Sequence, residues 1–239
     1  LASCNDFLDR EPLDSVTPDN FFFTENDLAA YAVKHYNFTT HEGFNAGIWK
    51  NDNATDNQAA TDYDKKWIPG QWKVPEAYDN PASNDPWYFS TIREANYFLE
   101  TVVPRFEKGE IEGSETNIKH YIGEMYFLRA KNYLSKLETF GDFPIIKNTL
   151  PDESESLIQA SKRAPRYKVA HFILEDLDQA ISLLTNNISG GKNRITKNAA
   201  LLLKSRAALF EASWLTYHKG TALVPGGPGW PGKAEDIAD

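Results

Sequence analysis

The chain has 239 residues, a formal net charge of −9 and a hydrophobic content of 41%. That hydrophobic content is typical of a folded domain and excludes an intrinsically disordered chain. The acidic balance argues against nucleic acid as a partner, because no basic surface is available to neutralise phosphates. No run of about 18 apolar residues occurs, so the sequence predicts no transmembrane helix.

The first residues contain the sole cysteine of the chain, Cys4. A single cysteine excludes an internal disulfide and a cysteine-based zinc site. The sequence Leu1-Ala2-Ser3-Cys4 resembles the last four positions of a bacterial lipobox, in which the cysteine becomes the lipidated N-terminus after signal cleavage. We therefore expect lipidation at Cys4, with an ordinary free cysteine as the alternative, and an extended leader over residues 1–16.

A helical domain is expected from residue 17 to residue 239. Thr17 and Pro18 provide an N-cap and a proline at the first helical position, which predicts a first helix over Asp19–Phe38. The following stretch, 39–86, breaks the pattern because it is rich in Asn, Asp, Gly and Pro, and a loop of this length is often functional. A short strand over Gly70–Val74 could form within it.

Residues 39–86 also hold the candidate ligand-binding side chains. A sugar presents apolar C–H faces and many hydroxyls, so its site needs aromatic rings beside acids and amides. The candidates for this role are Asp52, Asn53, Asp56, Tyr63, Trp67 and Trp72. The alternative interpretation is that the tryptophans attach a long loop to the helices, and for Trp87, at helical spacing with Ile92, we favour such a packing role.

Two helix pairs follow the insertion, at 86–138 and 166–217. The first pair comprises a helix from Pro86 to Pro104 and a helix over 115–138 that is apolar around most of its circumference. A helix of this kind is packed on several sides, so we expect it to be central. Gly141 is expected to end it, and 149–164 is expected to be a connecting loop.

The second pair comprises helices over 166–184 and 197–217, with a turn at Gly190-Gly191 and Thr196 as the cap of the last helix. A Pro/Gly-rich loop follows, in which Trp230 could be a ligand platform or a loop anchor. The second helix of each pair has a small–large–small spacing that resembles a tetratricopeptide unit: Gly123, Phe127 and Ala130, and Ser205, Leu209 and Ala212. The sequence therefore predicts an all-α fold.

No catalytic motif stands out. The pairs Asp52/Asp56 and Asp176/Asp178 could be imagined as the two carboxylates of a glycoside hydrolase, which lie roughly 5–9 Å apart. The loop pair has no evident cause for a raised pKa, and we interpret Asp176 and Asp178 as solvated or capping residues. No HExxH, GxSxG or phosphate-binding motif is present. We predict a non-enzymatic protein without a cofactor, a catalytic residue or a metal ligand.

The segment GEMYFLRAKNYLSKLETFGDFPII, 123–146, resembles the signature helix and loop of SusD/RagB-like proteins, which are outer-membrane lipoproteins that capture glycans. Further blocks occur in the order of that family, at 4–12, 87–99, 176–180 and 194–200. This resemblance covers nearly the whole chain.

The resemblance implies tetratricopeptide-like helix pairs in a right-handed superhelical scaffold with long loop insertions. It also implies a surface-exposed lipoprotein of the outer membrane that captures a glycan and passes it to a SusC-like TonB-dependent transporter. Family members are longer than this chain, so we expect an N-terminal portion of a larger domain. The alternatives are a RagB-like peptide binder, a protein-interaction scaffold without a small ligand, and a hydrolase.

Overall fold

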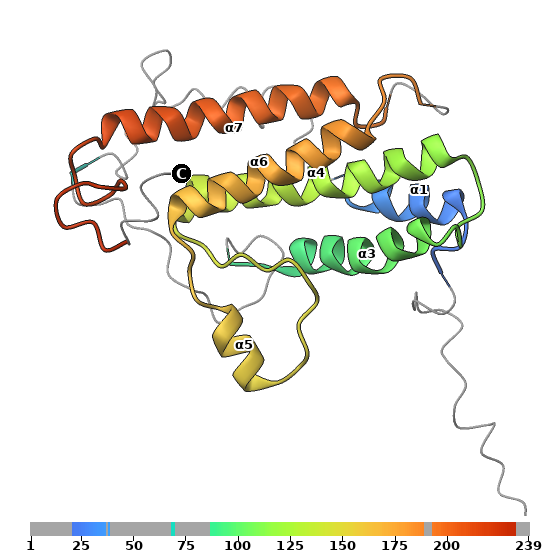
Figure 1. The fold of residues 1–239 in the computed structure, drawn as a ribbon, viewed down its shortest axis with the longest axis horizontal. Coiled ribbons are helices and arrows are strands. Elements are labelled where there is room, and N and C mark those ends of the chain that lie inside the picture. The colour runs from blue at the N-terminus through green and yellow to red at the C-terminus, as the bar shows by residue number, and fades with distance from the viewer. Residues whose placement is uncertain (1–20, 37, 39–67, 70–86, 189–192, 233–239) are drawn as a thin grey trace, which may run out of the picture.

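The computed structural model describes residues 21–36, 38, 68–69, 87–188 and 193–232 (Figure 1). Its helices in this part of the chain are α1 (Glu25–Lys34), α3 (Ser90–Glu107), α4 (Glu115–Phe140), α5 (Ser154–Ala160), α6 (Arg166–Leu183) and α7 (Lys197–Tyr217). β-Pairing among the described residues is limited to two isolated bridges, Thr24–Glu112 and Phe143–Ala164. Over the same residues, no helix combines the length and apolar character needed to span a bilayer.

Helix α1 is shorter than the predicted helix over Asp19–Phe38. Thr24 caps it: the Thr24 hydroxyl accepts from the backbone N–H of Asp27 at 3.3 Å, and the Asp27 carboxylate accepts from the N–H of Thr24 at 2.9 Å. Phe22, just before this cap, has a φ of 71°, which a right-handed helix does not allow. Its ring is fully buried, and burial of that ring stabilises the non-helical backbone. The predicted cap at Thr17 and Pro18 lies outside the described residues.

Helix α3 begins and ends later than predicted. Pro104 lies within its last turn and does not end it, because the carbonyl of Pro104 still accepts from the N–H of Lys108 at 3.2 Å. Trp87 precedes α3 instead of belonging to it. Its ring centroid lies 4.2 Å from that of Phe140 and 5.4 Å from that of Phe143, so the predicted packing role is confirmed.

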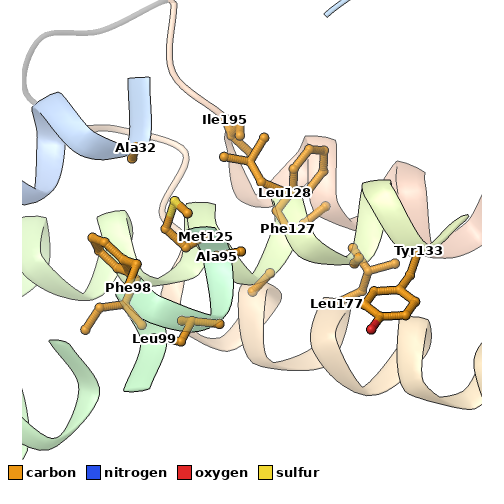
Figure 2. Packing of buried hydrophobic residues seen from close by; sticks show 14 of the residues in the cluster. Ala32, Ala95, Phe98, Leu99, Met125, Phe127, Leu128, Tyr133, Leu177 and Ile195 are labelled. Atoms are coloured by element: carbon orange, nitrogen blue, oxygen red, sulfur yellow. The ribbon is translucent and has the colours of Figure 1, made fainter. Parts of the chain in front are cut away.

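Helix α4 is central, as predicted. It contacts α1, α3, α6 and, over a short stretch, α7, and its apolar side chains form much of the core (Figure 2). Gly141, with a φ of 73°, ends it in a conformation that favours glycine. A Cβ on Gly123 would lie 3.0 Å from Cγ of Leu184, so this glycine allows the end of α6 to approach α4 closely.

The second helix pair also forms as predicted. Helices α6 and α7 have the expected bounds to within one residue, and the Thr196 hydroxyl caps α7 by accepting from the N–H of Ala199 at 3.3 Å. The expected loop over 149–164 is different, because it contains α5. This helix has seven residues and buries none of them. A segment this short does not contain enough apolar residues at helical spacing to predict a helix.

A buried charged cluster joins the two helix pairs. Arg129 of α4 donates to both carboxylate oxygens of Asp176 of α6, at 2.7 and 2.8 Å, and to the Asn96 side-chain oxygen of α3 at 2.8 Å. The interpretation of Asp176 as a solvated or capping residue is therefore wrong. A buried carboxylate requires a charged or hydrogen-bonding partner, and α4 supplies one that the sequence near Asp176 does not reveal.

A second buried cluster positions the entry to α7. Glu124 of α4 is fully buried and accepts from Nε of Arg194 at 2.8 Å. His120, one turn earlier, accepts from the N–H of Thr185 through Nδ1 at 3.2 Å, and its Nε2 lies 3.1 Å from a carboxylate oxygen of Glu124. Arg194 also donates to the Ala29 carbonyl of α1 at 3.3 Å. These bonds hold the segment before α7 against both α1 and α4.

Helices that follow one another therefore pack in pairs, α3 with α4 and α6 with α7, and contact between α4 and α6 joins the pairs. Figure 1 shows α7 along one edge of the bundle and α5 extending from the opposite side. The predicted all-α architecture built from helix pairs is confirmed.

Candidate functional site

The sequence-predicted ligand residues and the lipidation site all lie outside the described residues, so they stay predictions: Cys4, Asp52, Asn53, Asp56, Tyr63, Trp67 and Trp72. The same is true of the predicted strand over Gly70–Val74 and the predicted turn at Gly190-Gly191. Two cavities lined by described residues are candidates for a binding site.

The larger cavity, the α3–α5 pocket, has a volume of about 360 Å³ and lies between α3, α5 and the segment after α4. Its walls are mostly carbon, from Phe89, Ile92, Ile146, Leu150 and Leu157. Asn96 reaches this pocket, but its amide already donates to the Ile146 carbonyl at 2.8 Å and its oxygen accepts from Arg129. The α3–α5 pocket therefore suits an apolar group better than one rich in hydroxyls.

The second cavity, the α6–α7 pocket, has a volume of about 320 Å³ and a mixed polar and aromatic lining. Four parts of the chain build it: Asp142 just after α4, Arg166 and Tyr167 at the start of α6, Glu211 of α7, and the loop 222–232 with Trp230. The Pro/Gly-rich character of that loop lets it fold back over the ends of α6 and α7.

Arg166 is the most constrained side chain of the α6–α7 pocket. Its backbone N–H donates to the carboxylate of Asp142 at 2.8 Å, its Nε donates to Glu211 at 2.8 Å, and its Nη1 donates to the Leu137 carbonyl at 3.3 Å. The guanidinium carbon lies 4.0 Å from the ring centroid of Trp214, a cation–π contact. Arg166 is thus fixed from several sides before any ligand arrives.

The Arg166–Glu211 pair leaves hydrogen-bonding capacity unused. The two side chains are joined through one oxygen of Glu211, whereas Nη2 of Arg166 and the other oxygen, Oε1 of Glu211, are buried without a hydrogen-bond partner. Burial raises the pKa of the Glu211 carboxyl, and the neighbouring Arg166 guanidinium offsets this only in part. A donor and an acceptor of this ion pair are therefore buried without hydrogen-bond partners.

Aromatic rings form another part of the wall. The Tyr167 and Trp230 ring centroids lie 6.2 Å apart, with planes inclined at 60°. Gly232 permits this position of the indole, because a Cβ there would lie 2.1 Å from Cζ2 of Trp230. Trp230 is half-buried and is anchored against Tyr167, yet it still lines the cavity.

Sequence reasoning left Trp230 open as a ligand platform or a loop anchor, and it did not single out Arg166, Tyr167 or Glu211. One signal was available: Glu211 interrupts the apolar run of α7 between Phe210 and Ala212, and an acid inside an apolar run requires a partner. The identity of that partner was not available, since Arg166 lies 45 residues away along the chain.

Acidic, histidine and cysteine side chains do not gather in the described ranges into any group of three or more suited to a metal ion. The α6–α7 pocket combines aromatic walls from Tyr167 and Trp230 with the polar side chains of Asp142, Arg166 and Glu211, a lining that is typical of small-molecule sites.

Comparison with known proteins identifies the chain's relatives. Residues 6–209 match the SusD-like family described as "Starch-binding associating with outer membrane". The chain is 25% identical over 186 residues to "SusD-like protein P2" of Formosa agariphila, a match that covers 75% of this chain and 35% of the relative. It is also similar to a solved SusD-like protein of Bacteroides fragilis, with a TM-score of 0.57, 23% identity, and coverage of 86% of this chain and 38% of the other.

The solved relative confirms the tetratricopeptide-like helical scaffold. The chain spans little more than a third of the length of these relatives, 35% and 38%. The family match extends from the segment that follows Cys4 into the last helix of the second pair. This chain belongs to the SusD-like family of proteins.

Proposed function

We propose that the chain is the helical portion of a cell-surface lipoprotein that binds a glycan and passes it to a SusC-like TonB-dependent transporter of the outer membrane. The α6–α7 pocket carries this proposal, because it places the aromatic rings of Tyr167 and Trp230 beside the polar side chains of Asp142, Arg166 and Glu211. Membership of a family described as starch-binding supports the same class of ligand.

The insertion 39–86 provides the second part of the proposed ligand surface. Its Trp67 and Trp72 would stack on sugar rings, and Asp52, Asn53 and Asp56 would bond to hydroxyls, with Tyr63 able to do both. A surface with several aromatic positions suits an oligosaccharide, because each sugar unit adds a weak contact and the contacts act together.

Anchoring and transfer complete the proposal. Cys4 would carry the acyl chains that hold the protein at the membrane. The helical scaffold would present one surface to the transporter while the loops present another to the glycan. Binding without turnover is the expected activity, because the family is described by binding and the sequence contains no catalytic motif.

Migration of the purified protein in native gels that contain starch, laminarin, xylan or pectin tests glycan binding. We expect at least one polysaccharide to retard the protein, and a size analysis of that polysaccharide afterwards to show no cleavage. Retardation by none of them, combined with binding to a peptide library in calorimetry, would replace the proposal by the peptide-binding alternative.

The anchor and the transporter require their own measurements. Cys4→Ala in the lipoprotein precursor should shift the protein from the membrane fraction to the soluble fraction of the cell. Co-purification of a TonB-dependent transporter with the tagged wild-type protein is expected. Its absence in mild detergent, with the lipid anchor intact, would contradict the transfer step.

A further inference from the structure

We infer that the α3–α5 pocket binds a small aromatic carboxylic acid, with the ring against the apolar walls and the carboxylate at Arg93. The inference concerns a second site and a different class of ligand from a glycan, so it does not rest on the proposed function. The probe for this class is 3-phenylpropionate, which joins one phenyl ring to one carboxylate through a short chain.

Accessible apolar side chains form the walls of the α3–α5 pocket. They are Phe89, just before α3, Ile146 and Leu150, in the segment after α4, and Leu157 of α5. All four are half-buried or exposed, so a ligand that enters the pocket can reach them. Covering apolar surface of this kind is favourable, roughly in proportion to the area removed from water.

Most polar groups of the wall already have partners within the protein. The Asn96 amide donates to the carbonyls of Ile146 and Asn148, at 2.8 and 3.3 Å. The Ser161 hydroxyl donates to the Ile158 carbonyl at 2.8 Å. Because these donors are used, a ligand hydroxyl would give up its bonds to water without replacing them. The walls therefore favour an apolar group over a sugar.

Arg93 is the exception, and it determines the charge of the ligand. It is the one charged side chain among the described residues that line the pocket, and it is exposed. Within the described part of the chain, its guanidinium makes no hydrogen bond or ion pair. An arginine at an apolar wall keeps its charged end in solvent, so the charge lies at the opening of the pocket. A carboxylate there can accept two N–H bonds from the guanidinium.

The volume limits the ligand to one ring with a short chain. The pocket, at about 360 Å³, lies at the small end of ligand sites, which span roughly 300–1,000 Å³. A cavity of about 150 Å³ is enough to take up benzene, so the pocket has room for a phenyl ring and a few further atoms. Phe89 favours an aromatic group over an aliphatic one, because aromatic pairs attract each other beyond the effect of buried area.

One side of the pocket is fixed before binding, and the other tolerates substitution. The Phe89 ring stacks on Phe143 with centroids 5.0 Å apart, and the Tyr133 hydroxyl accepts from the N–H of Ile146 at 2.8 Å. These contacts reduce the ordering that binding requires. Leu157 lies on α5, which buries none of its residues, so Leu157→Ala should leave the bundle folded.

Three ligands separate the contributions of the ring and the charge. Saturation-transfer NMR titrations of the full chain compare 3-phenylpropionate, 3-phenylpropanamide and propionate. We expect the aromatic acid to bind and the neutral amide to bind about two- to fivefold more weakly, the effect of one exposed ion pair. Propionate should show no transfer, because it lacks the ring. Raising the salt concentration from about 50 mM to about 500 mM should remove the advantage of the acid.

Two variants and a matched control locate the site. Arg93→Met should weaken binding of the acid about two- to fivefold and leave binding of the amide unchanged, because the variant keeps the length of the side chain and removes its charge. Leu157→Ala should weaken both ligands about threefold or more, because both use the apolar wall. Arg206→Met, at an exposed arginine of α7, should change neither affinity.

Each failure has a distinct meaning. If 3-phenylpropionate does not bind the wild-type protein, the inference is wrong. If the acid and the amide bind equally, or Arg93→Met weakens both alike, Arg93 does not hold a carboxylate. If Arg93→Met and Leu157→Ala both leave binding of the acid unchanged, the acid binds elsewhere and the assignment to this pocket fails. Melting temperatures within a few degrees of wild type exclude unfolding of the variants. The native gels with polysaccharides test the glycan proposal separately, so either result can stand without the other.

Discussion

Helices α4 and α7 are both rich in apolar side chains, but they differ in how much of that surface is covered. Helix α4 buries 16 of its 26 residues, whereas α7 buries 3 of its 21. Leu202 and Leu209 of α7 remain 73% and 69% exposed. In the described part of the chain, α4 has neighbours on several sides, and α7 has α6 along its length and α4 at one short contact.

The apolar content of a helix therefore predicts how much of its surface gains stability from burial. The number of neighbouring helices determines how much of that surface is buried. The exposed positions Leu201, Leu202, Ala208, Leu209 and Ala212 of α7 recur at the spacing of one helix face. The outward face of α7 is therefore an apolar surface at the edge of the bundle (Figure 1).

The largest effect that tests this comparison concerns two acids of α6, one that faces α4 and one that faces α7. Asp176→Ala should lower the free energy of unfolding by about 3–5 kcal/mol, because it leaves Arg129 buried without its charged partner. Asp178 pairs with Lys204 of α7 in an exposed ion pair, so Asp178→Ala should cost roughly 0.2–1 kcal/mol. Urea unfolding measures both. Similar losses for the two variants would contradict the contrast between the two interfaces.

The next effect compares leucines of the two helices. Leu128 of α4 is 4% exposed, and Leu128→Ala should cost about 2–5 kcal/mol through lost burial and a cavity. Leu209→Ala of α7 should change stability by only about 0.5 kcal/mol or less, because the side chain is already in solvent. A large loss for Leu209→Ala in urea unfolding would mean that this face is covered in solution.

A smaller effect concerns Gly123 of α4 and Ser205 of α7, which occupy matching positions in the small–large–small spacing of the two helices. A Cβ on Gly123 would lie 3.0–3.2 Å from atoms of Leu183 and Leu184. Gly123→Ala should therefore cost about 1 kcal/mol, since overpacking outweighs the gain in helix propensity. Ser205→Ala, at the matching and exposed position of α7, should raise stability by a few tenths of a kcal/mol. Thermal unfolding of both variants checks the opposite signs.

The smallest effect concerns pH at the contact between α6 and α7. Because burial raises the pKa of Glu211 above its ordinary 4.5, the folded protein binds this proton more tightly than the unfolded chain does. The resulting stabilisation is complete below pH 4.5 and is lost as the pH rises through the raised pKa. Glu211→Gln should thus flatten the decline of stability with rising pH above 4.5.

An exposed acid provides the control for that profile. Lys119 lowers the pKa of Glu115 by a hydrogen bond and by its charge, so the stabilisation from Glu115 is present at neutral pH and lost as the pH falls. Unfolding free energies of Glu211→Gln and Glu115→Gln between pH 4 and pH 8 should therefore diverge from wild type in opposite directions. A parallel response of the two variants would contradict the burial of Glu211.

Much of the fold could be predicted from local sequence. The bounds of α6 and α7, the cap at Thr196 and the stop at Gly141 follow from periodicity and capping chemistry, which depend on residues close together in the chain. The predictions failed where a distant contact decides the local structure. Helix α1 begins at Glu25 because the Phe22 ring is buried beside Tyr31 and Phe98, and none of this is visible in a local pattern.

The sites were less predictable than the scaffold. The sequence predicted ligand-binding residues in the aromatic insertion 39–86. The α6–α7 pocket instead combines residues that lie far apart in sequence, from Asp142 to Trp230. A single acid in an apolar helix, Glu211, indicated that a partner exists. Only the packing of α6 on α7 identifies Arg166 as that partner and leaves one donor and one acceptor unused.

The sequence by itself determined the helix pairs, the central position of α4 and the membership of the SusD-like family, because these depend on periodicity, capping and motif order within short stretches. The tertiary structure alone decided that Asp176 is buried against Arg129, that the described helices leave an apolar face of α7 exposed, and that a polar and aromatic pocket forms at the ends of α6 and α7. Burial and charge pairing depend on which distant surfaces meet, and no local pattern contains that information.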